Sequence, residues 1–262
     1  MSYTCTNCRC RFPDFRLACP ECGTWGTLRK DDAHFGDSQA RPIPLPDVTA
    51  LNVPRTKTGI APFDELLGGG FVPGSSILLV GPPGAGKSTL LLQLLNSASG
   101  PALYVTGEES IQQLKLRADR LAIVTPGISL LFETEAGRIL TNLGNPPVRI
   151  LVIDSIQTIY TVNSDTLPGS TTQIRKCAYV LRRTAQQQGM VLVMVGQVTK
   201  NKRAAGPMLL EHAVDVVLVL EFDEDRPNRR LLEASKNRFG STGSQCVMQM
   251  TGSGFLFTGA KA

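Results

Sequence analysis

The sequence lacks a long apolar segment, an export signal and a strong excess of charge of either sign. No run of apolar residues approaches the ~18 to 20 that a membrane-spanning helix needs. The N-terminus, MSYTCTNCRCRF, has no apolar core of a secretion signal. These absences predict a soluble, cytoplasmic protein. The hydrophobic content of 42% over 262 residues excludes a disordered chain and suffices for one large domain, alone or with a small appendage.

Net charge and histidine content are also low. The 27 basic and 22 acidic side chains give a formal net charge of +5. This excess permits a polyanionic partner without requiring one, so the positions of the charges matter more than their sum. The two histidines, His34 and His212, have no ligand-like spacing, and we assign neither a chemical role.

Cysteine is abundant only at the N-terminus, where five of the seven cysteines fall within the first 22 residues. Cys5 and Cys8 form one Cys-x2-Cys pair, and Cys19 and Cys22 form a second. Two such pairs are typical of a closed, four-thiolate structural zinc site, and without an export signal they favour metal over disulfides. Cys10 is either a competing ligand or a free thiol.

Trp25 follows the second cysteine pair. We expect it to cover the metal site or to dock it on a neighbour, with base stacking as the alternative. Five basic and four acidic residues lie in the first 32, so electrostatics alone do not identify a DNA-binding finger.

Composition divides the chain into three parts. We predict a zinc finger over 1–30, a proline-rich polar linker over 31–56 and an ATPase domain over 57–262. Within the last part, apolar runs alternate with amphipathic helical patterns, which predicts an α/β fold with a mostly parallel sheet and helices on both faces. The expected strands are 77–81, 102–107, 149–155, 191–198 and 216–222, and the cysteines outside the finger, Cys177 and Cys246, are expected in the core.

The first expected strand leads directly into GPPGAGKST, which matches Gly-x4-Gly-Lys-Ser and precedes a helical pattern. In this phosphate loop, backbone N–H groups wrap the phosphates, Lys87 reaches the β- and γ-phosphates, and the Ser88 hydroxyl binds Mg²⁺. The motif therefore predicts ATP and Mg²⁺ as cofactors. The expected nucleotide-binding residues are Gly81, Pro82, Pro83, Gly84, Ala85, Gly86, Lys87, Ser88 and Thr89.

Acidic residues end two of the expected strands. Asp154 ends the run 150–153, and its spacing predicts a strand beside the phosphate-loop strand, where it holds Mg²⁺ through water. Glu108 and Glu109 follow 102–107 at the carboxyl edge of the sheet, where ligands bind in open α/β folds. We predict Glu108 as the catalytic base, whereas Glu109 is either a second candidate or an acid at a helix N-terminus.

Gln197 ends the strand 191–198 and is a candidate γ-phosphate sensor, with an ordinary strand-end hydrogen bond as the alternative. The segment after it carries Lys200, Lys202 and Arg203 with no acid before Glu211. Three cations beside a nucleotide sensor predict contact with a DNA phosphate backbone.

Two further basic segments follow different patterns. The predicted helix 171–189 has apolar positions at helical spacing, and its cations form a solvated face, a subunit contact or a DNA contact. Residues 226–238 hold five cations against one acid. Within them, Lys236 and Arg238 lie two apart on an expected strand, so both face one side, where they contact a neighbouring subunit's nucleotide or bind DNA.

These motifs together resemble the bacterial RadA/Sms DNA-repair ATPases, a branch of the RecA-like P-loop NTPases. The matching elements are the four-cysteine finger, KTGI with FDELLGGG, GPPGAGKST, YVTGEES, LRADRL, VIDSIQT, AGP with LEH, and KNRFGST. The resemblance covers nearly all of residues 1–258. The finger and KNRFG discriminate it from circadian-clock and signalling relatives.

The resemblance implies a DNA-dependent ATPase that forms hexameric rings on single-stranded DNA and drives branch migration of recombination intermediates. A RecA recombinase or a replicative helicase is an implied further partner. Family members carry His where this chain has Gln197, and RecA recombinases carry Gln there, so a working sensor is expected. Relative to the family, we expect the C-terminal Lon-protease-like domain to be missing, which affects ring stability and processivity.

Two other functions remain open on the sequence. One is a RecA-like regulatory ATPase that acts through a protein partner bound by its zinc finger. The other is an accessory DNA-binding protein that modulates full-length homologues without unwinding. The basic segment with Lys200, Lys202 and Arg203 argues against the first.

Overall fold

The computed structural model describes residues 3–5, 7–8, 10–12, 18–24, 28–30, 44–47, 54–144, 147–162, 167, 169–197 and 207–261. The chain forms two compact units, residues 1–51 and 52–262. This boundary falls inside the predicted linker 31–56. Among the described residues, no helix is long and apolar enough to cross a membrane.

The first unit contains a small antiparallel sheet with the order β2-β1-β3. Its strands are β1 (Tyr3–Cys5), β2 (Arg11–Phe12) and β3 (Leu28–Lys30). Its only other described regular element is the short 3-10 helix η1 (Leu45–Asp47). Among the described residues of this unit, Cys5 and Cys19 are buried, with Tyr3 and Phe12 packed against them. A core this small cannot stabilise a fold unaided, which fits the prediction that metal holds this unit together.

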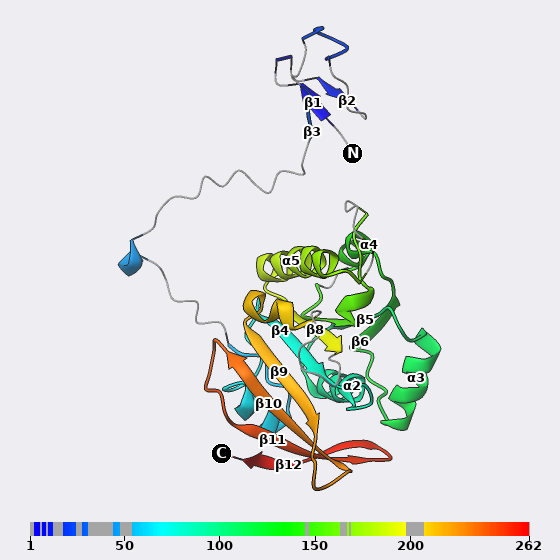
Figure 1. The fold of residues 1–262 in the computed structure, drawn as a ribbon, viewed down its shortest axis with the longest axis vertical. Helices are drawn as coiled ribbons and strands as arrows, with labels where there is room; N and C mark the ends of the chain where they lie inside the picture. Colours follow the sequence, from blue (N-terminus) through cyan, green and yellow to red (C-terminus); the bar gives the residue numbers. More distant parts are fainter. Residues whose placement is uncertain are drawn as a thin grey trace. The chain divides into compact units, whose positions relative to one another are not determined.

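The second unit is built on a nine-stranded sheet with the order β12-β11-β10-β9-β4-β8-β7-β5-β6. The strands from β9 to β6 in this order are parallel to their neighbours, and β10 to β12 continue the sheet as an antiparallel meander (Figure 1). The bounds are β4 (Ser76–Gly81), β5 (Ala102–Thr106), β6 (Ile128–Phe132), β7 (Ile150–Asp154), β8 (Val191–Gln197), β9 (Val216–Phe222), β10 (Arg229–Asn237), β11 (Gln245–Thr251) and β12 (Gly254–Lys261).

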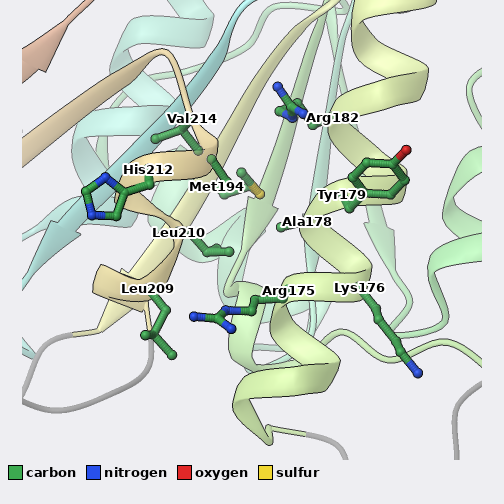
Figure 2. Close-up of a pocket in the computed structure, with 11 residues that line it drawn as sticks. Arg175, Lys176, Ala178, Tyr179, Arg182, Met194, Leu209, Leu210, His212 and Val214 are labelled. Atoms are coloured by element: carbon green, nitrogen blue, oxygen red, sulfur yellow. The ribbon is translucent and has the colours of Figure 1, made fainter.

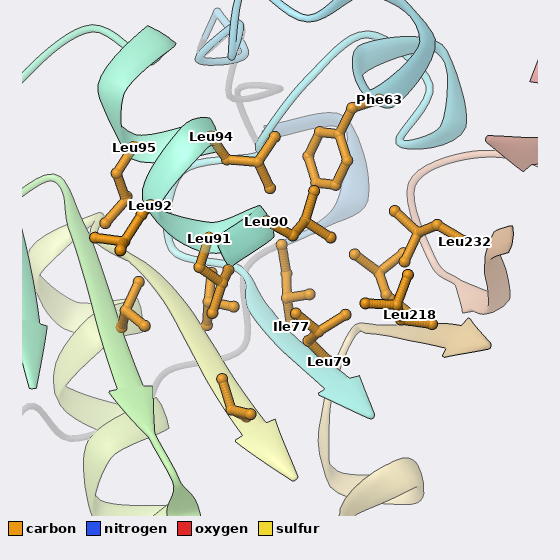
Figure 3. Close-up of a cluster of buried hydrophobic side chains, with 14 of the residues drawn as sticks. Phe63, Ile77, Leu79, Leu90, Leu91, Leu92, Leu94, Leu95, Leu218 and Leu232 are labelled. Atoms are coloured by element: carbon orange, nitrogen blue, oxygen red, sulfur yellow. The ribbon is translucent and has the colours of Figure 1, made fainter. Parts of the chain in front are cut away.

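Helices cover both faces of this sheet. One face packs against α1 (Ala61–Leu66), α2 (Lys87–Ser97) and α3 (Ile111–Arg120), and Figure 3 shows Leu90 and Leu91 of α2 lying over β4. The other face packs against α4 (Ala136–Thr141), η2 (Ile156–Thr158), α5 (Thr171–Gln188) and η3 (Pro207–Ala213). Cys177 and Cys246 are fully buried in these two cores, as the sequence predicts. The prediction of a mostly parallel sheet covered on both faces is confirmed.

The structure corrects the sequence reading in two places. The strand that ends in Asp154, β7, lies between β8 and β5, so it does not neighbour the phosphate-loop strand β4 as its spacing indicated. Sequence analysis also missed β6 and most of the β10–β12 meander. These strands are only half buried, with burial that alternates along β10 and β11, so they lack the continuous apolar runs of the parallel strands.

Candidate nucleotide site and cysteine cluster

The phosphate loop connects β4 to α2 and wraps closely against its surroundings. Every residue of β4 is buried, and α2 begins at Lys87. A side chain at Gly81 would collide with the carbonyl oxygen of Leu220 on the neighbouring strand β9. At Gly86, φ is +102°, and an added Cβ would lie 2.6 Å from the ring of Phe255 and 2.7 Å from Met250. Both glycines are therefore required by close packing as well as by the turn.

The side chain of Lys87 reaches back to the start of the phosphate loop. Its ammonium donates hydrogen bonds to the carbonyl oxygens of Gly81 at 2.9 Å and Pro82 at 3.0 Å. The side chain is buried, with 8% of its surface exposed. Burial lowers the pKa of Lys87, and the nearby carboxylates of Asp154 and Glu108 oppose this decrease. The ammonium thus lies at the phosphate cradle, and no carboxylate of the described residues pairs with it directly.

Asp154 at the end of β7 and Ser88 in the first turn of α2 converge, although β8 separates β7 from the phosphate-loop strand β4. The Ser88 hydroxyl donates to Asp154 Oδ2 at 2.6 Å, and the Tyr104 hydroxyl donates to the same oxygen at 2.5 Å. Burial and the charge of Asp154 raise the pKa of Tyr104 well above its usual value, so Tyr104 remains a donor. A hydroxyl and a carboxylate held together in this way fit the hard oxygen ligands that Mg²⁺ prefers.

Glu108 is held by two side chains from neighbouring strands. Gln197 Nε2 donates to both carboxylate oxygens of Glu108, at 2.9 and 3.2 Å, and the Ser155 hydroxyl donates to Oε1. In contrast, Glu109 turns away to pair with Arg117 of α3 at 2.5 Å. The predicted base and the predicted sensor are therefore in direct contact, and Glu109 is engaged in a separate ion pair.

These side chains line one cavity of about 510 Å³ at the carboxyl edge of the sheet. The phosphate loop, Glu108, Asp154 and Gln197 all contribute to it. Arg117 and Arg120 of α3 add two cations that sequence analysis did not single out. The hairpin between β11 and β12 forms another wall through Met250, Thr251 and Gly252, which sequence analysis also did not single out. The complete lining is Pro83, Gly84, Gly86, Lys87, Ser88, Thr89, Glu108, Glu109, Arg117, Arg120, Asp154, Gln197, Met250, Thr251 and Gly252.

Arg230 of β10 braces the phosphate loop from behind. Its Nε donates to the Ala85 carbonyl oxygen at 3.2 Å, and its Nη1 donates to the carbonyl oxygens of Pro227 and Arg229. The guanidinium lies 4.1 Å from the centre of the Phe222 ring, and burial lowers its pKa. Sequence analysis counted Arg230 only as one cation of a basic cluster, although the residue is buried, with 7% of its surface exposed.

The two cations of KNRFG point toward the segment between η3 and β9. Lys236 donates to the carbonyl oxygens of Glu211 and Val214, both at 2.7 Å, and Arg238 pairs with Asp215 at 3.1 Å. A β-bulge between Ala234 and Lys236 interrupts the register of β10 just before them. The predicted DNA contacts Lys200, Lys202 and Arg203, and also Trp25, lie outside the residues that the structure describes.

The four predicted zinc ligands come together in the first unit. The sulfurs of Cys5, Cys8, Cys19 and Cys22 all lie within 4.8 Å of one another. Cys5 Sγ is 3.7 Å from Cys22 Sγ, and Cys8 Sγ is 3.5 Å from Cys19 Sγ. Zn–S bonds of about 2.3 Å in a tetrahedron require sulfurs about 3.8 Å apart, so the cluster fits zinc. Cys10 is not part of this group, and its sulfur lies 3.9 Å from the Cys8 carbonyl oxygen.

Metal analysis of the purified protein is expected to give one zinc per chain. Four thiolates at these distances satisfy the ion completely, so the metal should survive gel filtration. Cys8→Ser should reduce the zinc content strongly, whereas Cys10→Ser is the matched control and should retain it. A zinc content near zero in the parent protein, or equal loss in both variants, would contradict the assigned ligand set.

Comparison with known proteins gives related sequences along nearly the whole chain. A family model described as "ATPase: KaiC" matches residues 56–124. The chain is 40% identical over 263 residues to the DNA repair protein RadA of Bacillus subtilis, covering 95% of this chain and 57% of that protein. It is 43% identical over 264 residues to RadA of Pseudomonas aeruginosa, covering 96% and 58%. The chain thus spans under two thirds of the length of these relatives.

Two solved structures share the fold of the second unit. A KaiC-like protein of Pyrococcus horikoshii superposes with a TM-score of 0.64 at 22% identity, covering 78% of this chain and 98% of that chain. A RadB recombinase superposes with a TM-score of 0.60 at 24% identity, covering 76% and 97%. At these identities the likeness establishes the fold alone, which is the RecA-like α/β fold that the sequence predicts.

Proposed function

We propose that this chain, which is 40% and 43% identical to the DNA repair proteins RadA of Bacillus subtilis and Pseudomonas aeruginosa and has a RecA-like α/β fold, is a DNA-dependent ATPase of DNA repair and homologous recombination. It couples ATP hydrolysis to binding of single-stranded DNA and to branch migration of recombination intermediates. The observation that carries this proposal is the direct contact of Glu108 with Gln197 in the cavity that also holds Lys87 and Asp154.

Hydrolysis is assigned to residues around this cavity. Backbone N–H groups of the loop from Gly81 to Thr89 cradle the phosphates, and Lys87 exchanges its carbonyl partners for phosphate oxygens. Ser88 and Asp154 would hold Mg²⁺, which would neutralise phosphate charge when bound. Glu108 orients the attacking water and accepts its proton, and Ser155 and Gln197 keep the carboxylate in place.

We assign to Gln197 the coupling between ATP hydrolysis and DNA binding. Gln197 ends β8 immediately before the segment with Lys200, Lys202 and Arg203. A γ-phosphate that draws the Gln197 amide away from Glu108 would act three residues before Lys200 in the chain. Gln157 Nε2 also donates to the Gln197 carbonyl oxygen at 3.3 Å, which links the same position to η2. ATP state and grip on the DNA phosphates are therefore coupled over a few residues.

The protein acts as a homo-oligomer, with the hexameric ring of the family as the proposed form. Lys236 and Arg238 are assigned to the nucleotide of a neighbouring subunit. Arg238 is the more accessible of the two, because 55% of its side chain is exposed, while Lys236 must first leave two carbonyl oxygens. The proposal also includes a zinc finger in the first unit and a cytoplasmic location. The proposed protein partner is a RecA recombinase or a replicative helicase.

ATPase activity is expected to rise on addition of single-stranded DNA, and the Lys200→Ala/Lys202→Ala/Arg203→Ala variant should lose most of this stimulation. Removing three phosphate contacts also lowers the slope of log affinity against log salt by about 2, at ~0.7 per contact for single strands. ATP hydrolysis is measured with and without single-stranded DNA, and DNA binding is measured by fluorescence anisotropy. Basal hydrolysis should not change.

The matched control removes the same charge from exposed positions elsewhere, as Lys57→Ala/Lys115→Ala/Arg138→Ala. This control should retain DNA stimulation. A parent ATPase rate that does not respond to single-stranded DNA would reject the DNA-dependent ATPase. Unchanged DNA binding in the first variant would instead support a regulatory ATPase that acts through a protein partner.

A further inference from the structure

A second cavity, of about 590 Å³, lies between α5 and η3 and shares no lining residue with the nucleotide cavity. Its floor is apolar, and Figure 2 shows residues of α5, β8 and η3 converging on it. The apolar lining consists of Ala178, Met194, Leu209, Leu210, Ala213 and Val214. A surface hollow of this size with an apolar floor is suited to receive a side chain from another molecule.

The rim of this groove is cationic. Arg175, Lys176 and Arg182 of α5 line it, and no acidic residue is among the described residues that line it. Arg175 and Arg182 are seven positions apart, so they lie on the same face of the helix about 10 Å from each other. In Figure 2 the Arg175 side chain extends from α5 toward Leu209 of the opposite wall.

These two guanidinium groups differ from most other cations of the second unit. Arg117, Arg229, Arg230 and Arg238 each donate to a carboxylate or a carbonyl oxygen of the chain. Within the described part of the chain, Arg175 and Arg182 have neither an ion-pair nor a hydrogen-bond partner. Arginine favours bidentate pairing with carboxylates, and no described residue of the groove lining supplies a carboxylate to these two arginines.

We propose that this groove docks a peptide segment of a partner protein in which an apolar side chain is flanked by acidic residues. The apolar side chain fills the floor between Ala178 and Leu210, and carboxylates on either side pair with Arg175 and Arg182. An extended peptide advances about 3.3 Å per residue, so acids three positions apart match the two arginines. The floor favours a peptide over nucleic acid, because it offers apolar surface beside the cations of the rim.

The test uses the full chain and a fluorescein-labelled synthetic peptide with a central Leu-Phe pair between two Asp residues, monitored by fluorescence anisotropy. The parent protein should bind it and lose affinity as NaCl rises from 50 to 500 mM, because salt screens the exposed ion pairs. Arg182→Glu should weaken binding at least tenfold, and Leu209→Ala several-fold. A peptide with Lys in place of both Asp residues should not bind.

Arg138→Glu is the control, since it makes the same charge reversal at an exposed arginine outside the groove lining. It should leave peptide affinity unchanged, and ATP hydrolysis should be the same in all three variants. Failure of the parent protein to bind the peptide would overturn the proposal. So would an Arg182→Glu variant that keeps its peptide affinity but loses binding of single-stranded DNA or self-association, which would assign the groove to nucleic acid or to a second copy. Because ATP hydrolysis is measured separately, failure here leaves the proposed ATPase untouched.

Discussion

Lys87→Ala is expected to abolish ATP turnover while the zinc content stays at one per chain. The ammonium lies at the phosphate cradle, 2.9 Å from the Gly81 carbonyl oxygen, and no described cation of the loop can replace it. Loss of a single preorganised group that stabilises transition-state charge costs roughly 10² to 10³-fold in rate, and loss of a full charge at a phosphate costs at least as much.

Phosphate release under saturating ATP measures this effect, and metal analysis of the same sample measures zinc. Lys57→Ala, which removes an exposed lysine of the same unit, is the control and should keep the parent rate. Turnover above about a tenth of the parent rate in Lys87→Ala would contradict the assignment of the phosphate loop. Loss of zinc in this variant would contradict the independence of the two units.

Glu108→Gln is expected to lower ATP hydrolysis by about 10² to 10⁴-fold while ATP still binds. A general base contributes about this much, and the amide cannot accept the proton of the attacking water. The substitution preserves the size of the side chain, and its carbonyl oxygen can still accept from Ser155 or Gln197. Binding should therefore be affected far less than the chemical step.

Single-turnover hydrolysis and titration with a fluorescent ATP analogue separate the two effects. Glu109→Gln is the matched control, since it removes the neighbouring carboxylate that pairs with Arg117. It should reduce hydrolysis much less than Glu108→Gln does. If the larger loss occurs in Glu109→Gln, the base has been assigned to the wrong acid.

Much of the candidate site could be predicted because its residues are close together in the sequence. Nine consecutive residues form the phosphate loop, and a Cys-x2-Cys pair already fixes the spacing of two thiolates. Asp154 and Gln197 end strands with a continuous apolar pattern, Glu108 follows another such strand, and parallel strands bring their carboxyl ends to one edge. The sequence thus indicated which residues share the edge, although not which of them are in contact.

Residues whose roles depend on distant contacts were missed. Tyr104 reads as one more apolar position of a buried strand, yet its hydroxyl reaches Asp154, 50 residues later. Ser155 reads as a strand-end residue, yet its hydroxyl holds Glu108. Arg230 reads as one cation of a basic cluster, yet it donates to the Ala85 carbonyl oxygen. No local pattern encodes such a partner, because the partner is chosen by the packing of strands that are far apart in the chain.

The sequence by itself determined the α/β class, the phosphate loop, the four clustered cysteines and the acids at the sheet edge, because periodicity and short motifs act over a few residues. Only the tertiary structure decided that β8 separates β4 from β7, that Gln197 holds Glu108, and that the β10–β12 meander braces the phosphate loop. It also decided that α5 and η3 enclose an apolar groove with a cationic rim. Strand order and side-chain contacts across the sheet minimise the free energy of the whole core, so they depend on all of its residues at once.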